Sequence, residues 1–178
     1  LLVFWGTFYS FGVFLKPLSQ EFGWTRAQTS WAFALSMGVQ GLVGILAGVI
    51  TDRFGPRRVM VASCLVTGLG YVLIYFTTAL WHLYIYYGVL VAIGTGASWV
   101  VPIATVPRWF TANRGLALGI VLSSIGAGQM VLPPVLTHLI TQFSWRFSFA
   151  VMGALVLVIG LPCSLLLRAK LPPCCLMI

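Results

Sequence analysis

Uncharged residues dominate the sequence in four long blocks. No Asp, Glu, Lys or Arg occurs in residues 27–51, 59–107, 115–145 and 147–167. A helix needs roughly 20 apolar residues to cross a hydrocarbon core about 30 Å thick. Each block is therefore long enough to span a bilayer once, and the second block is long enough to span it twice.

Dividing the second block near residues 77–82 gives six predicted helices and no strands. Barrel strands would be shorter and would alternate in polarity, so the fold class is an all-α polytopic membrane protein. The predicted spans are about 1–15, 27–51, 59–79, 83–106, 115–139 and 146–167. Pro17 is expected to end the first span, whereas Thr25 with Gln28, and Ser144, are expected to cap later ones. Residues 1–170 then form one bundle, and 171–178 form an irregular tail, expected from a truncated reading frame.

The composition agrees with a membrane protein. Ten basic and two acidic residues give a net charge of +8, yet charged residues are only 7% of the chain. Soluble domains carry about 25% charged residues. The mean hydropathy is +1.04. Because the basic residues fall in short connections between apolar blocks, they indicate membrane topology and not nucleic-acid binding.

The basic residues divide unequally between the two ends of the predicted bundle. One end has Arg53, Arg57, Arg58, Arg108, Arg114, Arg168 and Lys170, and the other has Lys16, Arg26 and Arg146. Cytoplasmic loops are enriched in Lys and Arg. The count predicts a multi-pass protein of the cell membrane whose first end, together with the N-terminus, is cytoplasmic.

Small residues form stripes on two predicted helices. The second helix has Gly38, Gly41, Gly44 and Gly48 within an arc of about 120°. The fifth helix has Gly115, Gly119 and Ser123. Such stripes predict close packing between helices, and direct contact with a ligand is the alternative.

The connection after the second helix carries a lone acid among bases. An acid at a helix C-terminus is unfavourable unless a cation or another helix N-terminus faces it. The segment reads Gly-x-x-x-Asp-Arg-x-Gly-x-Arg-Arg and resembles the signature loop of the major facilitator superfamily, with Pro56 as a departure. The resemblance implies a cytoplasmic gate that holds two six-helix halves together in the outward-facing state. Its residues would be Gly48, Asp52, Arg53, Gly55, Arg57 and Arg58.

A second motif begins the fifth predicted helix. It is similar to the signature of monocarboxylate transporters at Phe110, Arg114, Leu116, Ala117 and Gly119. Two bases of that signature are replaced, by Ala112 and Asn113, which points toward the oxalate/formate-antiporter-like group. Residues 11–24 also resemble the exit of helix 1 in that group. The resemblance reaches about residue 170 and equals the N-terminal half of a twelve-helix fold.

The resemblance implies a secondary active transporter, here a fragment, that moves small monocarboxylates or related organic anions by alternating access. Proton symport and anion exchange both remain open. Because no Lys or Arg lies near the middle of a span, the charge partner of the substrate is expected in a C-terminal six-helix half. The expected partners are therefore the lipid bilayer, a small organic anion and that second half.

Polar residues within spans are the candidates for the substrate cavity. Gln129 ranks first because it places a carboxamide on an otherwise apolar helix, although a bond to a neighbouring helix is the alternative role. Tyr9 stands near the position of an intramembrane Lys in vertebrate-type carriers. The full set is Gln129, Tyr9, Trp99, Ser98, Ser123 and Ser124.

Other functions find less support in the sequence. It contains no HExxH, no phosphate-binding loop and no nucleophile set, so we expect no enzyme, no metal site and no cofactor. A carrier of another solute, such as a drug, sugar or phosphate ester, is one alternative. A non-transporting six-helix remnant or structural membrane protein is the other.

Overall fold

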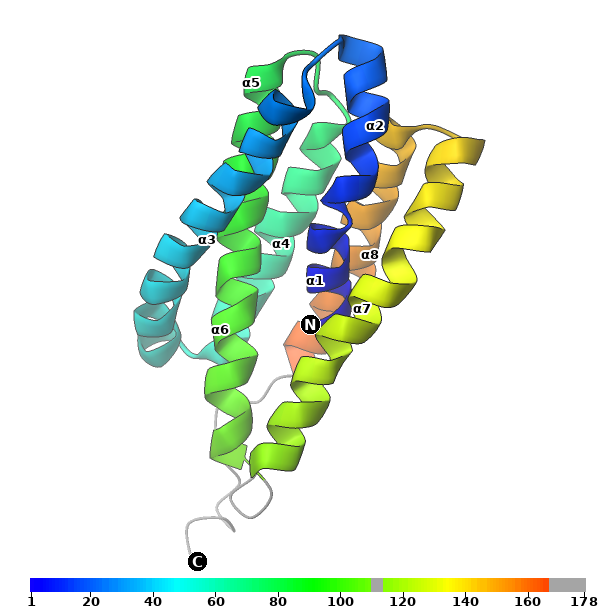
Figure 1. Cartoon of the computed structure of the whole chain (residues 1–178). Coiled ribbons are helices and arrows are strands. Elements are labelled where there is room, and N and C mark those ends of the chain that lie inside the picture. The colour runs from blue at the N-terminus through cyan, green and yellow to red at the C-terminus, as the bar shows by residue number, and fades with distance from the viewer. Residues whose placement is uncertain (110–113, 167–178) are drawn as a thin grey trace, which may run out of the picture.

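A computed structural model describes residues 1–109 and 114–166, and within these ranges every regular element is a helix. The helices form an elongated bundle (Figure 1). In chain order they are α1 (Leu2–Tyr9), α2 (Phe11–Phe22), α3 (Arg26–Phe54), α4 (Pro56–Ile74), α5 (Leu80–Leu83), the π-helix η1 (Tyr84–Val91), α6 (Ala92–Trp109), α7 (Arg114–Gln142) and α8 (Trp145–Leu166). The predicted all-α membrane fold is confirmed.

Within the described ranges, five uninterrupted helical segments are long and apolar enough to cross a membrane. They are Arg26–Phe54, Pro56–Ile74, Leu80–Val106, Arg114–Gln142 and Trp145–Leu165. The third of them joins α5, η1 and α6 into one span. The first predicted span corresponds to α1 and α2, which are separated at Ser10.

The first span differs from its predicted limits. It was expected to end near residue 15, before Pro17, but α2 continues through this proline to Phe22. Gly23 ends the helix instead, because its φ of 66° is a left-handed conformation that glycine adopts easily. The predicted caps are present. Thr25 and Gln28 form a reciprocal capping box, and the Ser144 hydroxyl accepts a hydrogen bond from the Phe147 amide at 3.2 Å.

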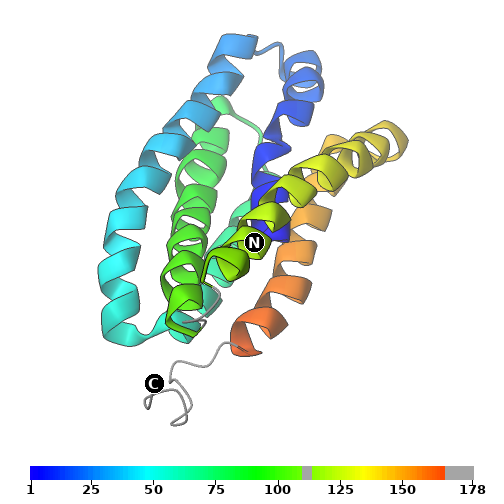
Figure 2. The same cartoon turned by 60° about the horizontal axis from the view of Figure 1, so that its bottom comes forward.

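Helix α1 lies at the centre of the bundle. It packs against α6, α7 and α8, and its residues from Phe4 to Phe8 are all buried. Around it, α4 packs against α8 and α6, while α3 packs against α6 and η1. Figure 2 shows α7 crossing the bundle obliquely, beside the N-terminus.

The closest helix contacts are made by glycines outside the predicted stripes. A Cβ on Gly6 would lie 2.8 Å from the Gly128 carbonyl oxygen, so α1 and α7 meet backbone to backbone. Helices α4 and α8 meet in the same way at Gly153, where a Cβ would lie 3.0 Å from the Gly68 oxygen. These pairs let the helix axes approach closely.

The two predicted stripes are largely open. A Cβ added at Gly44 or at Gly48 would lie 3.7 or 3.9 Å from the Val100 side chain, which is an ordinary van der Waals distance. At Gly38, Gly41, Gly115 and Gly119, no described atom lies within 4 Å of that position. The prediction that these stripes mediate close packing is wrong among the described residues, because four of the glycines have no neighbouring atom and the other two make only ordinary contacts. In the most apolar 18-residue stretch of α3, and likewise of α7, only 11% of the residues are buried, whereas 50% are buried in the corresponding stretch of α4.

Candidate functional site

The interruption of the first span is held by side-chain hydrogen bonds. At Ser10 the backbone leaves the regular helix, and the Ser10 hydroxyl donates to the Gly6 carbonyl at 2.6 Å. The Tyr87 hydroxyl donates to the Phe8 carbonyl at 2.9 Å. Irregular backbone at membrane depth requires such partners because lipid supplies none.

The partner of this interruption is the π-helical segment η1 of the fourth span. Tyr87, which lies in η1, is fully buried. Its ring stacks on Phe8 and Phe11, with centroid distances of 5.8 and 4.2 Å. π-Helical turns within long helices occur often at functional sites. Two irregular segments, from the first and fourth spans, therefore meet at one tyrosine.

Next to this point, aromatic rings from α1 and α6 form a wall. Trp5 lies edge-on to Trp99 at a centroid distance of 4.8 Å, and 5.5 Å from Tyr9. Trp5 is buried, whereas 41% of Tyr9 is exposed. Two predicted candidates, Tyr9 and Trp99, are thus brought together by Trp5, which the sequence analysis did not single out.

Gln40 adds an amide to this wall. Its Nε2 donates to the Thr95 hydroxyl at 3.1 Å, and Thr95 donates in turn to the Val91 carbonyl at 2.9 Å. The close approach of α3 and α6 depends on Gly96, where a Cβ would lie 2.9 Å from the Gln40 carbonyl oxygen. A carboxamide has two N–H donors, so the bond to Thr95 leaves the Gln40 side chain with a further donor.

Gln40 and the two tryptophans, Trp5 and Trp99, line an open cavity of about 260 Å³, which we call the aromatic cavity. It lies between α1, α3 and α6 and is lined by Trp5, Met37, Gln40, Gly41, Gly44, Gly96 and Trp99. The Trp5 Nε1–H is buried and has no hydrogen-bond partner within the described ranges. The exposed Gly41 of the glycine stripe lines this cavity. A second cavity, of about 180 Å³, adjoins Tyr9 between α1, α2 and α3.

The remaining predicted cavity residues are placed differently. Ser98 is fully buried and donates to the Thr95 carbonyl of its own helix at 2.8 Å. Ser123 and Ser124 likewise donate to carbonyls one turn earlier in α7, at 2.9 and 2.6 Å. Gln129 is exposed on α7, next to the glycine that contacts α1. The structure does not bring these four side chains together with the aromatic cavity.

The predicted gate motif lies at one end of the bundle, which we call the basic end (Figure 1). Here α3 turns into α4 through Gly55, whose φ of 88° favours glycine. The charged members of the motif, Asp52, Arg53, Arg57 and Arg58, are all exposed.

The second predicted signature lies at the start of α7. Arg114 begins the helix, Leu116 and Gly119 are exposed, and Ala117 is partly buried. Phe110 lies outside the described residues. Because α7 begins at the basic end (Figure 1), both signatures are at the same end of the bundle.

A polar cluster at the opposite end was missed by the sequence analysis. Glu21 of α2 accepts hydrogen bonds from the Trp145 indole and from Arg146, the latter at 3.1 Å. The Arg146 guanidinium also lies over the Trp145 ring, 5.1 Å from its centroid. Glu21 is one of only two acids in the chain, which is the sequence signal for this contact. The cluster joins the first span to the sixth.

No group of three or more metal-ligating side chains occurs in the ranges that the structure describes. The spans also hold no formal charge at mid-depth, because residues 27–51, 59–107 and 115–145 lack Asp, Glu, Lys and Arg. Recognition in the aromatic cavity would therefore use neutral donors and ring surfaces.

Comparison with known proteins gives a consistent result. The profile of the Major Facilitator Superfamily matches residues 1–173. The chain is 32% identical over 164 residues to monocarboxylate transporter 11 of Mus musculus, covering 92% of this chain and 36% of that protein. It is 31% identical over 167 residues to monocarboxylate transporter 13 of Bos taurus, covering 94% of the chain and 39% of the relative. The chain thus spans little more than a third of the length of these relatives.

Proposed function

Because the chain belongs to the major facilitator superfamily, we propose that it forms one six-helix lobe of a carrier for small organic anions. The observation that carries this proposal is the aromatic cavity, whose lining includes both Gln40 and Trp5. The buried Trp5 Nε1–H has no hydrogen-bond partner among the described residues. The relatives are named as monocarboxylate transporters and not as enzymes. A monocarboxylate is accordingly the substrate class we assign.

The proposed binding chemistry uses neutral donors. A carboxylate moved into a membrane must replace its lost hydration with hydrogen bonds or a cation. The Gln40 Nε2–H and the Trp5 Nε1–H would donate to carboxylate oxygens, and Trp99 would contact the apolar part of a small acid. The compensating cation would come from a second six-helix lobe.

The exposed faces of α3 and α7 support a second lobe. Both helices present open glycine positions where neighbouring backbones can approach closely. Carriers built from two such lobes bind substrate between them and alternate access by rocking. In this proposal Asp52 and Arg53 of the exposed motif contact the second lobe at the basic end, which would face the cytoplasm.

Whether substrate transport is coupled to a proton or to a second anion depends on the same distribution of charge. With no acid in mid-span, this lobe supplies no carboxylate proton carrier within the membrane. Proton symport would require a proton site in the second lobe, whereas anion exchange would need none. Uptake that rises as the outside pH is lowered would favour symport.

The proposal is tested by transport in proteoliposomes made with the full-length carrier that contains this chain. Labelled lactate, pyruvate, formate and oxalate are offered at two pH values. Gln40→Leu removes an amide donor and should raise the transport KM by about 2- to 10-fold, the equivalent of one hydrogen bond. Gln142→Leu, at the exposed end of α7, is the matched control and should leave KM unchanged. An unaltered KM in Gln40→Leu would remove the aromatic cavity from the substrate path.

A further inference from the structure

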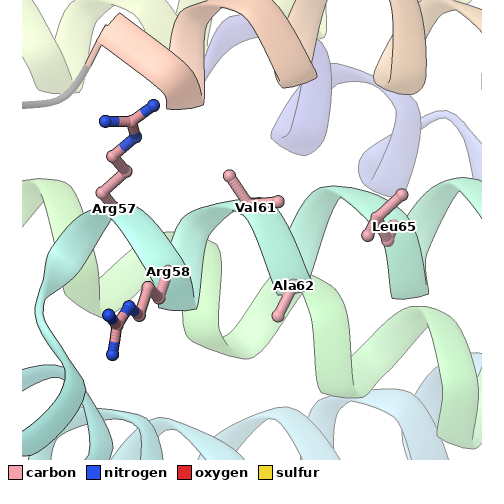
Figure 3. Close-up of a pocket in the computed structure, with 5 residues that line it drawn as sticks. All are labelled: Arg57, Arg58, Val61, Ala62 and Leu65. Atoms are coloured by element: carbon pink, nitrogen blue, oxygen red, sulfur yellow. The ribbon is translucent and has the colours of Figure 1, made fainter.

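Two more cavities lie toward the basic end, on a different side of the bundle. The first, of about 400 Å³, is lined by Arg57, Arg58, Val61, Ala62 and Leu65 of α4 (Figure 3). The second, of about 320 Å³, lies between α3, α4 and α6 and is lined by aliphatic side chains and small residues. Ala62 lines both cavities, so the two lie on adjacent faces of α4 on either side of this residue, and together we call them the α4 groove.

The α4 groove is separate from the aromatic cavity. On α3, Gln40 and Gly44 line the aromatic cavity, whereas Leu46 and Ile50 line the groove. At about 100° per residue these two pairs are centred about 120° apart around the helix. A molecule in the α4 groove would therefore not compete for the proposed substrate site.

The mouth of the groove is basic. Figure 3 shows the Arg57 and Arg58 side chains leaving α4 on opposite sides, with Arg58 on the side of Ala62. Helix α4 begins at Pro56 without a side-chain cap, so its first-turn amides and the positive end of its dipole add to the basic character here. An anion is favoured at the mouth, while the interior suits only apolar matter.

We propose that the α4 groove binds one anionic phospholipid from the membrane leaflet at the basic end. The phosphate would lie at Arg58 and the start of α4, and one acyl chain would follow Ala62 into the groove. From residue 58 to residue 66, α4 rises about 12 Å, most of the hydrocarbon depth of one leaflet, about 15 Å. This combination of an anionic head and an apolar tail distinguishes a lipid from a free phosphate or a soluble acid.

The headgroup contact is tested by native mass spectrometry of the full-length carrier that contains this chain, purified in detergent. Phosphatidylglycerol and phosphatidylcholine are offered in equal amounts, with inorganic phosphate as a competitor. One arginine near a membrane surface is expected to favour the anionic lipid about five-fold. Arg58→Gln should abolish this preference. Arg53→Gln removes the same charge from the same connection but does not line the groove, so it should retain the preference.

The acyl-chain contact is tested separately. Ala62→Phe fills the groove and leaves the arginines in place, so it should also abolish retention of phosphatidylglycerol. Ala154→Phe adds the same side chain at an exposed alanine of α8 and should retain the lipid. If circular dichroism shows that Ala62→Phe has lost helix, the comparison of Arg58→Gln with Arg53→Gln decides.

Three results would overturn the proposal. One is equal retention of the two lipids by the unmodified full-length carrier. Another is an equal loss of binding in Arg58→Gln and Arg53→Gln. The third is complete displacement of phosphatidylglycerol by inorganic phosphate, which would show that the groove contributes nothing beyond its charges.

Discussion

The contact of α1 with α7 yields a prediction with an internal control. At Gly128 an added Cβ would meet the Leu2 carbonyl oxygen and lie 3.1 Å from the Leu2 carbonyl carbon and 3.3 Å from the Gly6 Cα. These are backbone atoms, so no side chain can rotate away. At Gly126, two residues earlier in α7, no described atom lies within 4 Å of an added Cβ.

Gly128→Ala and Gly126→Ala share every effect except this contact. Replacing Gly by Ala in a helix interior gains about 1 kcal/mol of helix propensity, which is the same in both variants. Overpacking costs about 1–3 kcal/mol, and only Gly128→Ala incurs it. The difference between the two variants is therefore about 1–3 kcal/mol, with Gly128→Ala the less stable.

Thermal unfolding in detergent, followed by intrinsic fluorescence and by size exclusion, measures this difference. For a chain of this length, each kcal/mol corresponds to about 2–4 °C in Tm. The Tm of Gly126→Ala should equal or exceed that of the unmodified chain. The Tm of Gly128→Ala should lie several degrees below that of Gly126→Ala. Equal Tm values for the two variants would refute the backbone contact between α1 and α7.

Two further predictions concern the polar contacts of the bundle. Tyr87→Phe removes the hydroxyl that donates to the buried Phe8 carbonyl and should lower the free energy of unfolding by about 1–3 kcal/mol. Tyr75→Phe, at an exposed ring, is the control and should have no effect. Equal unfolding temperatures for the two variants would contradict the hydrogen bond across the helix interruption. Glu21→Gln removes the ion pair with Arg146, whose partners are 44% and 37% exposed, so it should cost at most about 1 kcal/mol. High salt should remove the Glu21→Gln difference in Tm, and a salt-independent loss would contradict the electrostatic origin.

Much of the fold could be predicted because its signals are local. Long uncharged blocks locate the spans, since lipid excludes charge and enforces backbone hydrogen bonding. The capping box of Thr25 and Gln28 needs only residues three positions apart. The end of the first span was mispredicted because Gly23, and not Pro17, adopts the conformation that stops the helix.

The site could be predicted less well because its contacts are distant in sequence. Gln40 and Thr95 are 55 positions apart, and nothing in the local sequence of either residue indicates that pairing. Glycine periodicity also did not reveal which glycines are packed, because that depends on the partner helix and not on spacing. Tyr9 and Trp99 were recognisable as polar aromatics in spans, but only the fold shows that Trp5 joins them.

The hydrogen bond from the Tyr87 hydroxyl to the Phe8 carbonyl has a consequence for how the helix bundle can deform. It ties two places where regular helix fails, one in the first span and one in the fourth, so bending at either place strains the other. Their amides should accordingly exchange with deuterium at one shared rate. Local fluctuation there becomes a concerted event of two segments almost eighty positions apart.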